Sequence, residues 1–250
     1  MKNQETTNKK PQTIKRFMSS TVYLIPSVLH EKATETIPAY VLDAVKQCQV
    51  FFVENERSAR RYLKSIWKEM VIDDYGWVLI DKTNTNAALY AFNKHLKEGK
   101  NIGIISEAGC PGVADPGQLL AEAAHAAGAI VKPLVGPSSI LLALMASGMN
   151  GQQFQFVGYL PIDTAQRIKV IKELEAESAK KNCTQIFIET PYRNNQLLET
   201  LIKQGRPTTK LCIAADITAD TEYIKTKTLA EWKKQLPDLH KRPTIFCMLG

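Results

Sequence analysis

Ser106-Glu107-Ala108-Gly109-Cys110-Pro111-Gly112-Val113-Ala114-Asp115-Pro116-Gly117 is the most informative stretch of this 250-residue chain. It follows an apolar run, residues 102–105, that predicts a buried strand, and it precedes residues 118–128, which predict a helix ending on a glycine. Three glycines and two prolines in its last nine residues predict a rigid loop that presents backbone N–H and C=O groups to a small ligand. Taken alone, the loop also fits an ordinary strand-to-helix connection.

Strand and helix patterns alternate along the whole chain, which predicts an α/β fold. In the first half, mostly parallel strands are expected at residues 22–25, 50–53, 102–105 and 130–134, with helices at 39–48, 58–70, 85–97 and 118–128. In the second half, we expect a mixed sheet with strands at 154–157, 185–189, 211–215, 222–226 and 244–249, and helices at 140–147, 164–180, 194–203 and 229–235. These patterns predict two α/β domains, residues 19–135 and 136–250, with the ligand cleft between them.

The N-terminal residues 1–18 are polar and basic and predict a disordered tail, with Met18 as an alternative start of the protein. The net charge is +7, of which residues 1–20 carry +4, so the folded body is mildly basic and favours nucleic acid only weakly. No secretory signal and no apolar run of about 20 residues is present, so we expect no membrane association.

The five cysteines are scattered without a C-x-x-C pair, and the four histidines lack the spacing of metal ligands. This pattern predicts reduced thiols, a cytoplasmic location and no metal site. The loops that follow predicted strands contain neither G-x-G-x-x-G nor G-x-x-x-x-G-K-[ST]. Dinucleotide and P-loop nucleotide chemistry therefore lose support.

Several segments, taken in chain order, match the motifs of one known family. Residues 21–26 match its opening strand, and Glu54-Asn55-Glu56-Arg57 stands where the family has an E-D-T-R motif. Residues 106–117 match S-D-A-G-T-P-x-x-x-D-P-G, with Glu107 in place of its Asp and Cys110 in place of its Thr. Residues 133–137 match P-L-P-G-P, residues 158–161 G-F-L-P, and residues 187–193 F-Y-E-S-x-x-R. Over residues 20–250 the chain resembles the tetrapyrrole methylase superfamily of S-adenosylmethionine (SAM)-dependent methyltransferases. Within it, the chain is most similar to the small-subunit ribosomal RNA cytidine 2′-O-methyltransferases.

The resemblance implies a homodimeric enzyme that binds SAM in the cleft between its two domains. It implies that the cofactor contacts come from Pro26, Ala108, Gly109, Cys110, Val113, Ser138, Ser139, Ile140, Glu189, Thr190, Pro243 and Thr244. Trp67, Trp77 and Trp232 are expected to supply apolar surface for the dimer. Methyl transfer from SAM mainly requires alignment of donor and acceptor and exclusion of water, which suits loops with few titratable groups.

The acceptor is predicted to be the ribose 2′-hydroxyl of a ribosomal RNA cytidine. An alcohol is a weak nucleophile, so a carboxylate that accepts its proton is useful, and the candidates are Glu54, Asp115 and Asp216. Asp115 also fits a role in forming the turn before Pro116, and Glu54 also fits an ion pair with Arg57 or Arg60. The candidates for RNA contacts are Arg193 and a basic stripe on the helix at 58–70, which also fits a solvated face, and which comprises Arg57, Arg60, Arg61, Lys64 and Lys68.

Three departures from the family pattern concern the acceptor. Residues 26–31 replace the family's P-T-P-I-G-N-L loop, and residues 214–219 replace A-R-E-x-T-K, with Ala215 and Ala219 where the family has Arg and Lys. The chain also ends at Gly250, without the C-terminal helical extension of the ribosomal RNA enzymes. Two alternatives therefore stay open: a methyltransferase acting on a tetrapyrrole or other small molecule, and a non-catalytic SAM- or RNA-binding module.

Overall fold

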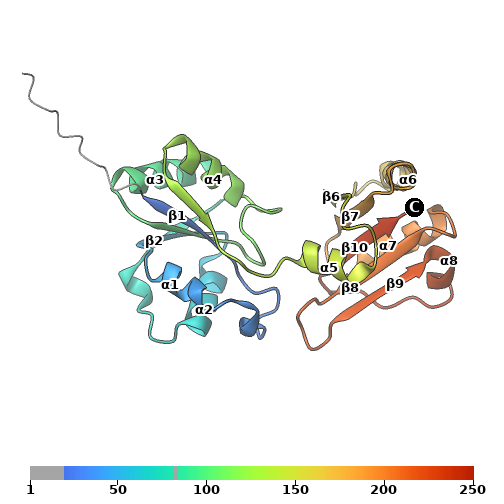
Figure 1. Ribbon diagram of the computed structural model, residues 1–250, viewed down its shortest axis with the longest axis horizontal. Helices are drawn as coiled ribbons and strands as arrows, with labels where there is room; N and C mark the ends of the chain where they lie inside the picture. Colours follow the sequence, from blue (N-terminus) through green and yellow to red (C-terminus); the bar gives the residue numbers. More distant parts are fainter. Residues whose placement is uncertain (1–19, 82–83) are drawn as a thin grey trace, which may run out of the picture.

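The computed structural model describes residues 20–81 and 84–250, so the predicted tail at residues 1–18 lies outside the described residues. The described chain forms two α/β domains, each built on a five-stranded sheet. Figure 1 shows them as two lobes lying side by side, joined by the segment that leads from β5 (Ile130–Pro133) to α5 (Ser139–Ser147).

The N-terminal sheet has the order β3-β2-β4-β1-β5, and all its strand pairs are parallel, as predicted. Its strands are β1 (Thr21–Ile25), β2 (Val50–Val53), β3 (Gly76–Leu79), β4 (Ile102–Ile105) and β5. The strand β3 was not predicted from the sequence. It lies at the sheet edge, where its residues are only half-buried or exposed, so its hydrophobic pattern is weak.

Helices cover both faces of this sheet because its strands direct successive side chains to opposite sides. Along β2, Phe51 and Val53 pack under α1 (Tyr40–Val45) and α2 (Glu56–Ile66), while Val50 and Phe52 pack under α3 (Thr85–Lys97) and α4 (Gly117–Ala126). The parallel strands place the loops after β1, β2 and β4 at one edge of the sheet. This edge carries the glycine-rich stretch.

The C-terminal sheet has the order β6-β7-β10-β8-β9; its β6–β7 pair is parallel and its other pairs are antiparallel, which confirms the predicted mixed sheet. Its strands are β6 (Phe154–Tyr159), β7 (Thr184–Ile188), β8 (Lys210–Ala215), β9 (Tyr223–Thr228) and β10 (Thr244–Leu249). One face is covered by α6 (Thr164–Lys181), α7 (Asn194–Gln204) and α8 (Leu229–Trp232), and the other by α5.

Several expected helices differ from the structure in their bounds. The helix expected at residues 39–48 runs from Tyr40 to Val45, and the one expected at 229–235 ends at Trp232. The helix expected at residues 58–70 runs from Glu56 to Ile66, and it starts earlier because Asn55 caps it by accepting hydrogen bonds from Arg57 N and Ser58 N. Trp232, expected at a dimer surface, is fully buried and donates from Nε1 to Leu211 O at 2.8 Å, so it supplies no surface.

All five cysteines are free thiols. Within residues 20–81 and 84–250, no cluster of histidine, cysteine, aspartate and glutamate is arranged to hold a metal ion. In the same residues, no helix is long and apolar enough to cross a membrane.

Candidate functional site

The glycine-rich loop between β4 and α4 is held in shape by Asp115. Its Oδ1 accepts hydrogen bonds from Gly112 N and Gly117 N, both at 2.7 Å. Burial, the larger influence, raises the pKa of the Asp115 carboxyl above its usual range, although the two N–H bonds favour the charged form. The geometry gives this carboxylate a loop-forming contact, which was one of the two roles that the sequence left open.

Gly109 lies where this loop approaches both the loop after β1 and the residues before α5. Its φ of +76° is left-handed, and its backbone pairs with Ser27 through hydrogen bonds of 2.9 and 3.2 Å. A Cβ at Gly109 would lie 3.3 Å from Pro137 O and 3.4 Å from Leu29 Cδ2. The chain therefore keeps a bare backbone at a place where three segments converge.

A cavity of about 290 Å³ opens beside this loop, between the two domains. Its N-terminal wall and the start of α5 contain nine residues that the sequence singled out: Glu54, Ala108, Gly109, Cys110, Val113, Asp115, Ser138, Ser139 and Ile140. The C-terminal wall is apolar and was not predicted; it consists of Phe156, Tyr159, Ile188 and Ile245. Burial raises the pKa of the Cys110 thiol, so this cavity holds a neutral thiol at neutral pH.

A smaller cavity of about 70 Å³ adjoins the first, because Ser139 and Ile245 line both. Pro243, Thr244 and Asp216 line it, so the structure brings three further predicted residues to the same cleft. We call the two cavities together the interdomain cleft. It is lined by loops from both halves of the chain, as the motif positions predicted.

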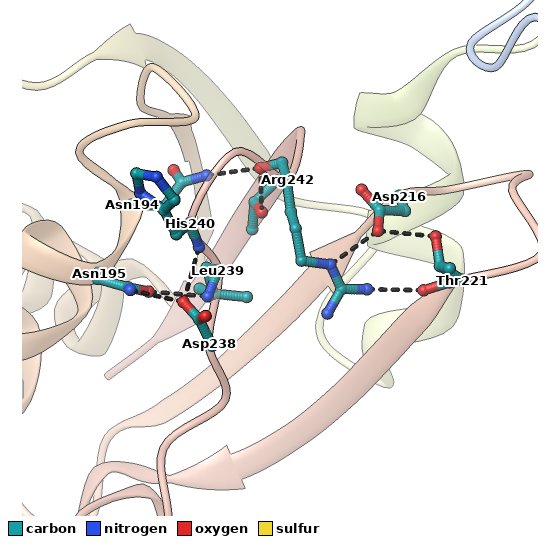
Figure 2. Close-up of polar contacts among 9 residues, drawn as sticks. Asn194, Asn195, Asp216, Thr221, Asp238, Leu239, His240 and Arg242 are labelled. Atoms are coloured by element: carbon teal, nitrogen blue, oxygen red, sulfur yellow. Dashed lines mark hydrogen bonds and ion pairs between the residues drawn. The ribbon is translucent and has the colours of Figure 1, made fainter.

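Asp216 and Arg242 form an ion pair at the C-terminal side of this cleft (Figure 2). Arg242 Nε donates to Asp216 Oδ2 at 2.7 Å, and its Nη2 donates to Thr221 O at 2.6 Å. Thr221 Oγ1 also donates to Asp216 Oδ2, at 2.9 Å. The sequence predicts a loss of positive charge here, because Ala215 and Ala219 stand at positions where the family has Arg and Lys. The structure shows that Arg242 places a guanidinium beside Asp216 from a distant segment.

The same network continues into α7 and the segment before β10. Asn194 Nδ2 donates to Arg242 O at 2.7 Å, and Asn195 binds Asp238 and the backbone of Leu239 (Figure 2). The Asp216 carboxylate is thus committed to holding the loop between β8 and β9. Nothing in the sequence near Arg242 indicated this pairing, since the two residues are 26 positions apart.

Glu189, Thr190 and Arg193 form a separate cluster after β7. The buried Glu189 Oε1 accepts from Thr190 N at 2.6 Å, from Arg193 Nη2 at 2.7 Å and from Arg193 Nε at 3.0 Å. These three predicted residues do not line the interdomain cleft, and neither does Pro26. Pro26 instead packs against Gly136, where an added Cβ would lie 2.1 Å from Pro26 Cβ.

Four cations of the predicted basic stripe lie on α2 and the fifth, Lys68, lies just beyond its end; several of them contact other protein groups. Arg60 pairs with Glu56 at 2.7 Å and lies over the Trp77 ring, and Arg61 pairs with Glu31 at 3.7 Å. Lys64 Nζ donates to the carbonyls of Lys68 and Met70 at the end of the helix. Arg57 and Lys68 are exposed at the two ends of the stripe.

Comparison with known proteins connects this architecture to one family. The model of the family described as Tetrapyrrole (Corrin/Porphyrin) Methylases matches residues 33–233. The Ribosomal RNA small subunit methyltransferase I of Mesorhizobium japonicum is 33% identical over 61% of this chain and 54% of its own length. The protein of the same name from Buchnera aphidicola is 27% identical over 94% of this chain and 80% of its own length. The crystal structure of a diphthine synthase has the same fold, with a TM-score of 0.66 at 14% identity over 93% of this chain and 90% of its own.

Proposed function

This chain belongs to the tetrapyrrole (corrin/porphyrin) methylases, and we propose that it is a SAM-dependent methyltransferase that modifies ribosomal RNA. The observation that carries the proposal is the interdomain cleft, which gathers the motif residues of both halves around one bare backbone position, Gly109. The names of the relatives supply the class of acceptor.

The residues of the cleft fit a ligand with one polar and one flat end. The loop at 108–113 and the start of α5 offer backbone groups and hydroxyls to an amino-acid moiety, while Ile245, Pro243 and Thr244 surround the smaller cavity, which suits an adenine. Bound there, SAM supplies a methyl group on a sulfonium. The chain's own contribution is to hold the acceptor in line with that group, beside the apolar residues Phe156, Ile188 and Ile245 of the larger cavity.

Among the three carboxylates singled out by the sequence, Glu54 is the best placed to receive a proton. It lines the larger cavity, and its Oε1 lies 3.5 Å from Glu107 N. Asp115 and Asp216 are committed to loop contacts. We therefore propose that Glu54 accepts or orients the hydroxyl proton of the acceptor, the ribose 2′-hydroxyl of a cytidine.

Two experiments test the proposal at its two levels. Titration calorimetry with S-adenosylhomocysteine is expected to show binding, and no detectable binding at millimolar ligand would contradict the cofactor assignment. Mass spectrometry of ribosomal RNA from cells lacking the protein, beside a wild-type control, is expected to show one missing 2′-O-methylcytidine. Binding without any missing methyl group would instead favour a small-molecule acceptor or a non-catalytic module.

The remaining sequence-based expectations belong to this proposal. A homodimer predicts a mass near twice the 27.9 kDa of the chain in light scattering at micromolar protein. A mass near 28 kDa under these conditions would contradict it. The domain boundary at residues 135 and 136 and the cytoplasmic location also stay predictions.

A further inference from the structure

A third cavity, of about 160 Å³, is formed by the N-terminal domain alone and lies next to the interdomain cleft. We call it the side pocket. Its walls come from the loop after β1, from α2 and from the first residues of the loop after β4, and its residues span only positions 27–107. Ser106 and Glu107 line both the side pocket and the interdomain cleft. A group bound in the side pocket therefore lies directly beside a group bound in the cleft.

The partition between the two cavities is a short chain of polar contacts. Ser58 Oγ, at the start of α2, donates to Glu107 Oε1, and Glu107 N lies 3.5 Å from Glu54 Oε1. Ser27 Oγ donates to Ser106 O at 2.9 Å and fixes the floor of the partition. The Glu107 carboxylate thus has a defined position at the boundary.

The charges around the side pocket restrict what it can hold. It contains two carboxylates, Glu31 and Glu107, and one guanidinium, Arg61, alongside apolar walls from Val28, Ala59 and Ile105. This net negative surround disfavours an anion such as a phosphate or a carboxylated macrocycle. It suits a flat, neutral ring that donates hydrogen bonds to a carboxylate and accepts them from Arg61.

We propose that the side pocket binds the nucleobase of the acceptor nucleotide, and that Glu107 selects a base with an exocyclic amino group. This inference rests on the proposed function. In a nucleotide the base is attached to C1′, next to the carbon that bears the 2′-hydroxyl. A hydroxyl presented to the interdomain cleft therefore places its base in an adjoining space, and single-stranded RNA bases are commonly splayed out to enter such pockets.

Cytosine matches the walls of the side pocket, and uracil does not. A carboxylate accepts a hydrogen bond from the cytosine N4 amino group, and N3 and O2 on the same edge are acceptors for the N–H groups of Arg61, which lines the side pocket and also pairs with Glu31 at 3.7 Å. In uracil the O4 oxygen replaces the amino group, so two acceptors would meet at Glu107. Glu107 is therefore a specificity-determining residue, and the reading of the base is separate from the binding of the cofactor.

The first test measures nucleoside binding without turnover. Ligand-observed NMR of the protein saturated with S-adenosylhomocysteine is expected to show millimolar binding of cytidine and at least tenfold weaker binding of uridine. Glu107→Gln, whose amide can donate to O4, is expected to reduce this preference about tenfold. Ser65→Leu, at an exposed helix position that lines only the side pocket, is expected to abolish cytidine binding while S-adenosylhomocysteine still binds.

The second test measures methyl transfer to 30S subunits from cells lacking the protein, and to subunits reconstituted with uridine at the mapped cytidine. Glu107→Gln is expected to lower kcat/KM on the natural subunit by about tenfold to a hundredfold and to narrow the gap between the two substrates. Glu35→Gln, an exposed glutamate outside both cavities, is the matched control and should behave as the wild type.

The outcomes separate the two proposals. Transfer to 30S subunits with unchanged base preference in Glu107→Gln overturns the role of the side pocket and leaves the proposed function standing. Uridine as the natural target overturns both the role of the side pocket and the assignment of a cytidine, and leaves SAM-dependent methylation of ribosomal RNA standing. Cytidine binding that depends on Glu107, without any transfer to 30S subunits, supports the side pocket and overturns the proposed function. Absence of both cytidine binding and transfer overturns both.

Discussion

The two sides of the interdomain cleft are organised in different ways. On the N-terminal side, Asp115 shapes the loop through backbone N–H groups only two and three residues away. On the C-terminal side, Asp216 is held by Arg242, which comes from a segment 26 residues further on and is itself held by Asn194 (Figure 2). A local carboxylate–backbone turn shapes the loop on one side, and a long-range network of side chains holds the loop after β8 on the other side.

This difference predicts two kinds of sensitivity to mutation. The N-terminal wall depends on backbone conformation, so added volume or a lost acceptor should disrupt ligand binding with modest effects on the rest of the domain. On the C-terminal side, the loop after β8 depends on the partly buried ion pair of Asp216 and Arg242, so these two residues should act together, and the loss of one should leave the other as an unpaired charge.

The largest effect is expected for Gly109→Leu. The left-handed φ strains any side chain at this position, a Cβ would lie 3.3 Å from Pro137 O and 3.4 Å from Leu29 Cδ2, and Gly109 itself lines the cleft. We expect at least a hundredfold loss of S-adenosylhomocysteine affinity in calorimetry. Gly128→Leu is the matched control, because it has a φ of +71° with nothing within 4 Å of a Cβ. It should lose about 1–2 kcal/mol of stability and keep its affinity. Retained affinity in Gly109→Leu would mean that the loop is only a connection.

The next effect in size is expected for Asp115→Ala. It removes the acceptor of two short backbone hydrogen bonds, each worth about 1.5–3 kcal/mol when the acceptor is charged. We expect about a tenfold loss of ligand affinity together with a lower unfolding free energy in urea. Asp115→Asn keeps an oxygen at the same place and should bind ligand within about threefold of the wild type. Equal binding by all three proteins, with normal cofactor KM and a lower kcat, would instead point to a proton-transfer role.

The same pair of variants has a pH signature. Burial raises the pKa of Asp115, so between its ordinary pKa and the raised value the folded protein binds more protons than the unfolded chain. The unfolding free energy contributed by this residue therefore falls as pH rises through that window, starting near pH 3.8. Asp115→Asn should lack this contribution and be at least as stable as the wild type at pH 7, measured by urea denaturation at several pH values.

The N-terminal wall could be predicted from the sequence because its information is local. Glycines at positive φ, the aspartate before a proline and the apolar run of β4 all lie within residues 102–117. The central strands and the helix at 85–97 were predicted for the same reason, since their periodicity lies within one segment. The helix at residues 56–66 was predicted at 58–70, two residues too late at its start, because the capping side chain of Asn55 fixes where it begins.

The C-terminal wall could not be predicted to the same degree, because its contacts join residues far apart in the sequence. Phe156, Tyr159, Ile188 and Ile245 read as ordinary strand residues, and only the packing of the two domains brings them to the cleft. Arg242 lies in no motif that the sequence singled out, although it places a guanidinium beside Asp216, next to Ala215 where the family has an arginine. Trp232 was expected at the surface because the pattern of a single short helix does not reveal which face is covered.

A smaller effect is expected from breaking the C-terminal pair. Arg242→Met and Asp216→Asn should each weaken S-adenosylhomocysteine binding about threefold to tenfold, because both residues hold segments that line the smaller cavity. The double variant should bind S-adenosylhomocysteine no more weakly than the more impaired single variant. In urea denaturation, the two substitutions should likewise be non-additive, with a coupling of about 1–3 kcal/mol in unfolding free energy. Additive effects would show that the two residues act independently. A loss of kcat in Asp216→Asn with unchanged cofactor affinity would restore Asp216 as a catalytic carboxylate.

The smallest effect concerns the outer face of the N-terminal domain, where the basic stripe of α2 lies. Three cations of the stripe, Arg60, Arg61 and Lys64, already contact carboxylates or backbone carbonyls. The test therefore uses the two exposed cations at the ends of the stripe, as the double variant Arg57→Gln with Lys68→Gln. If these two cations contact phosphate, the slope of log affinity for 30S subunits against log salt concentration should become shallower by up to the amount expected for about two phosphate contacts. The loss of affinity should be largest at low salt. Lys172→Gln with Lys180→Gln makes the same charge change on exposed positions of α6 in the other domain and should leave the slope unchanged. Equal slopes for both double variants would show that net charge alone matters, and that the stripe is a solvated helix face.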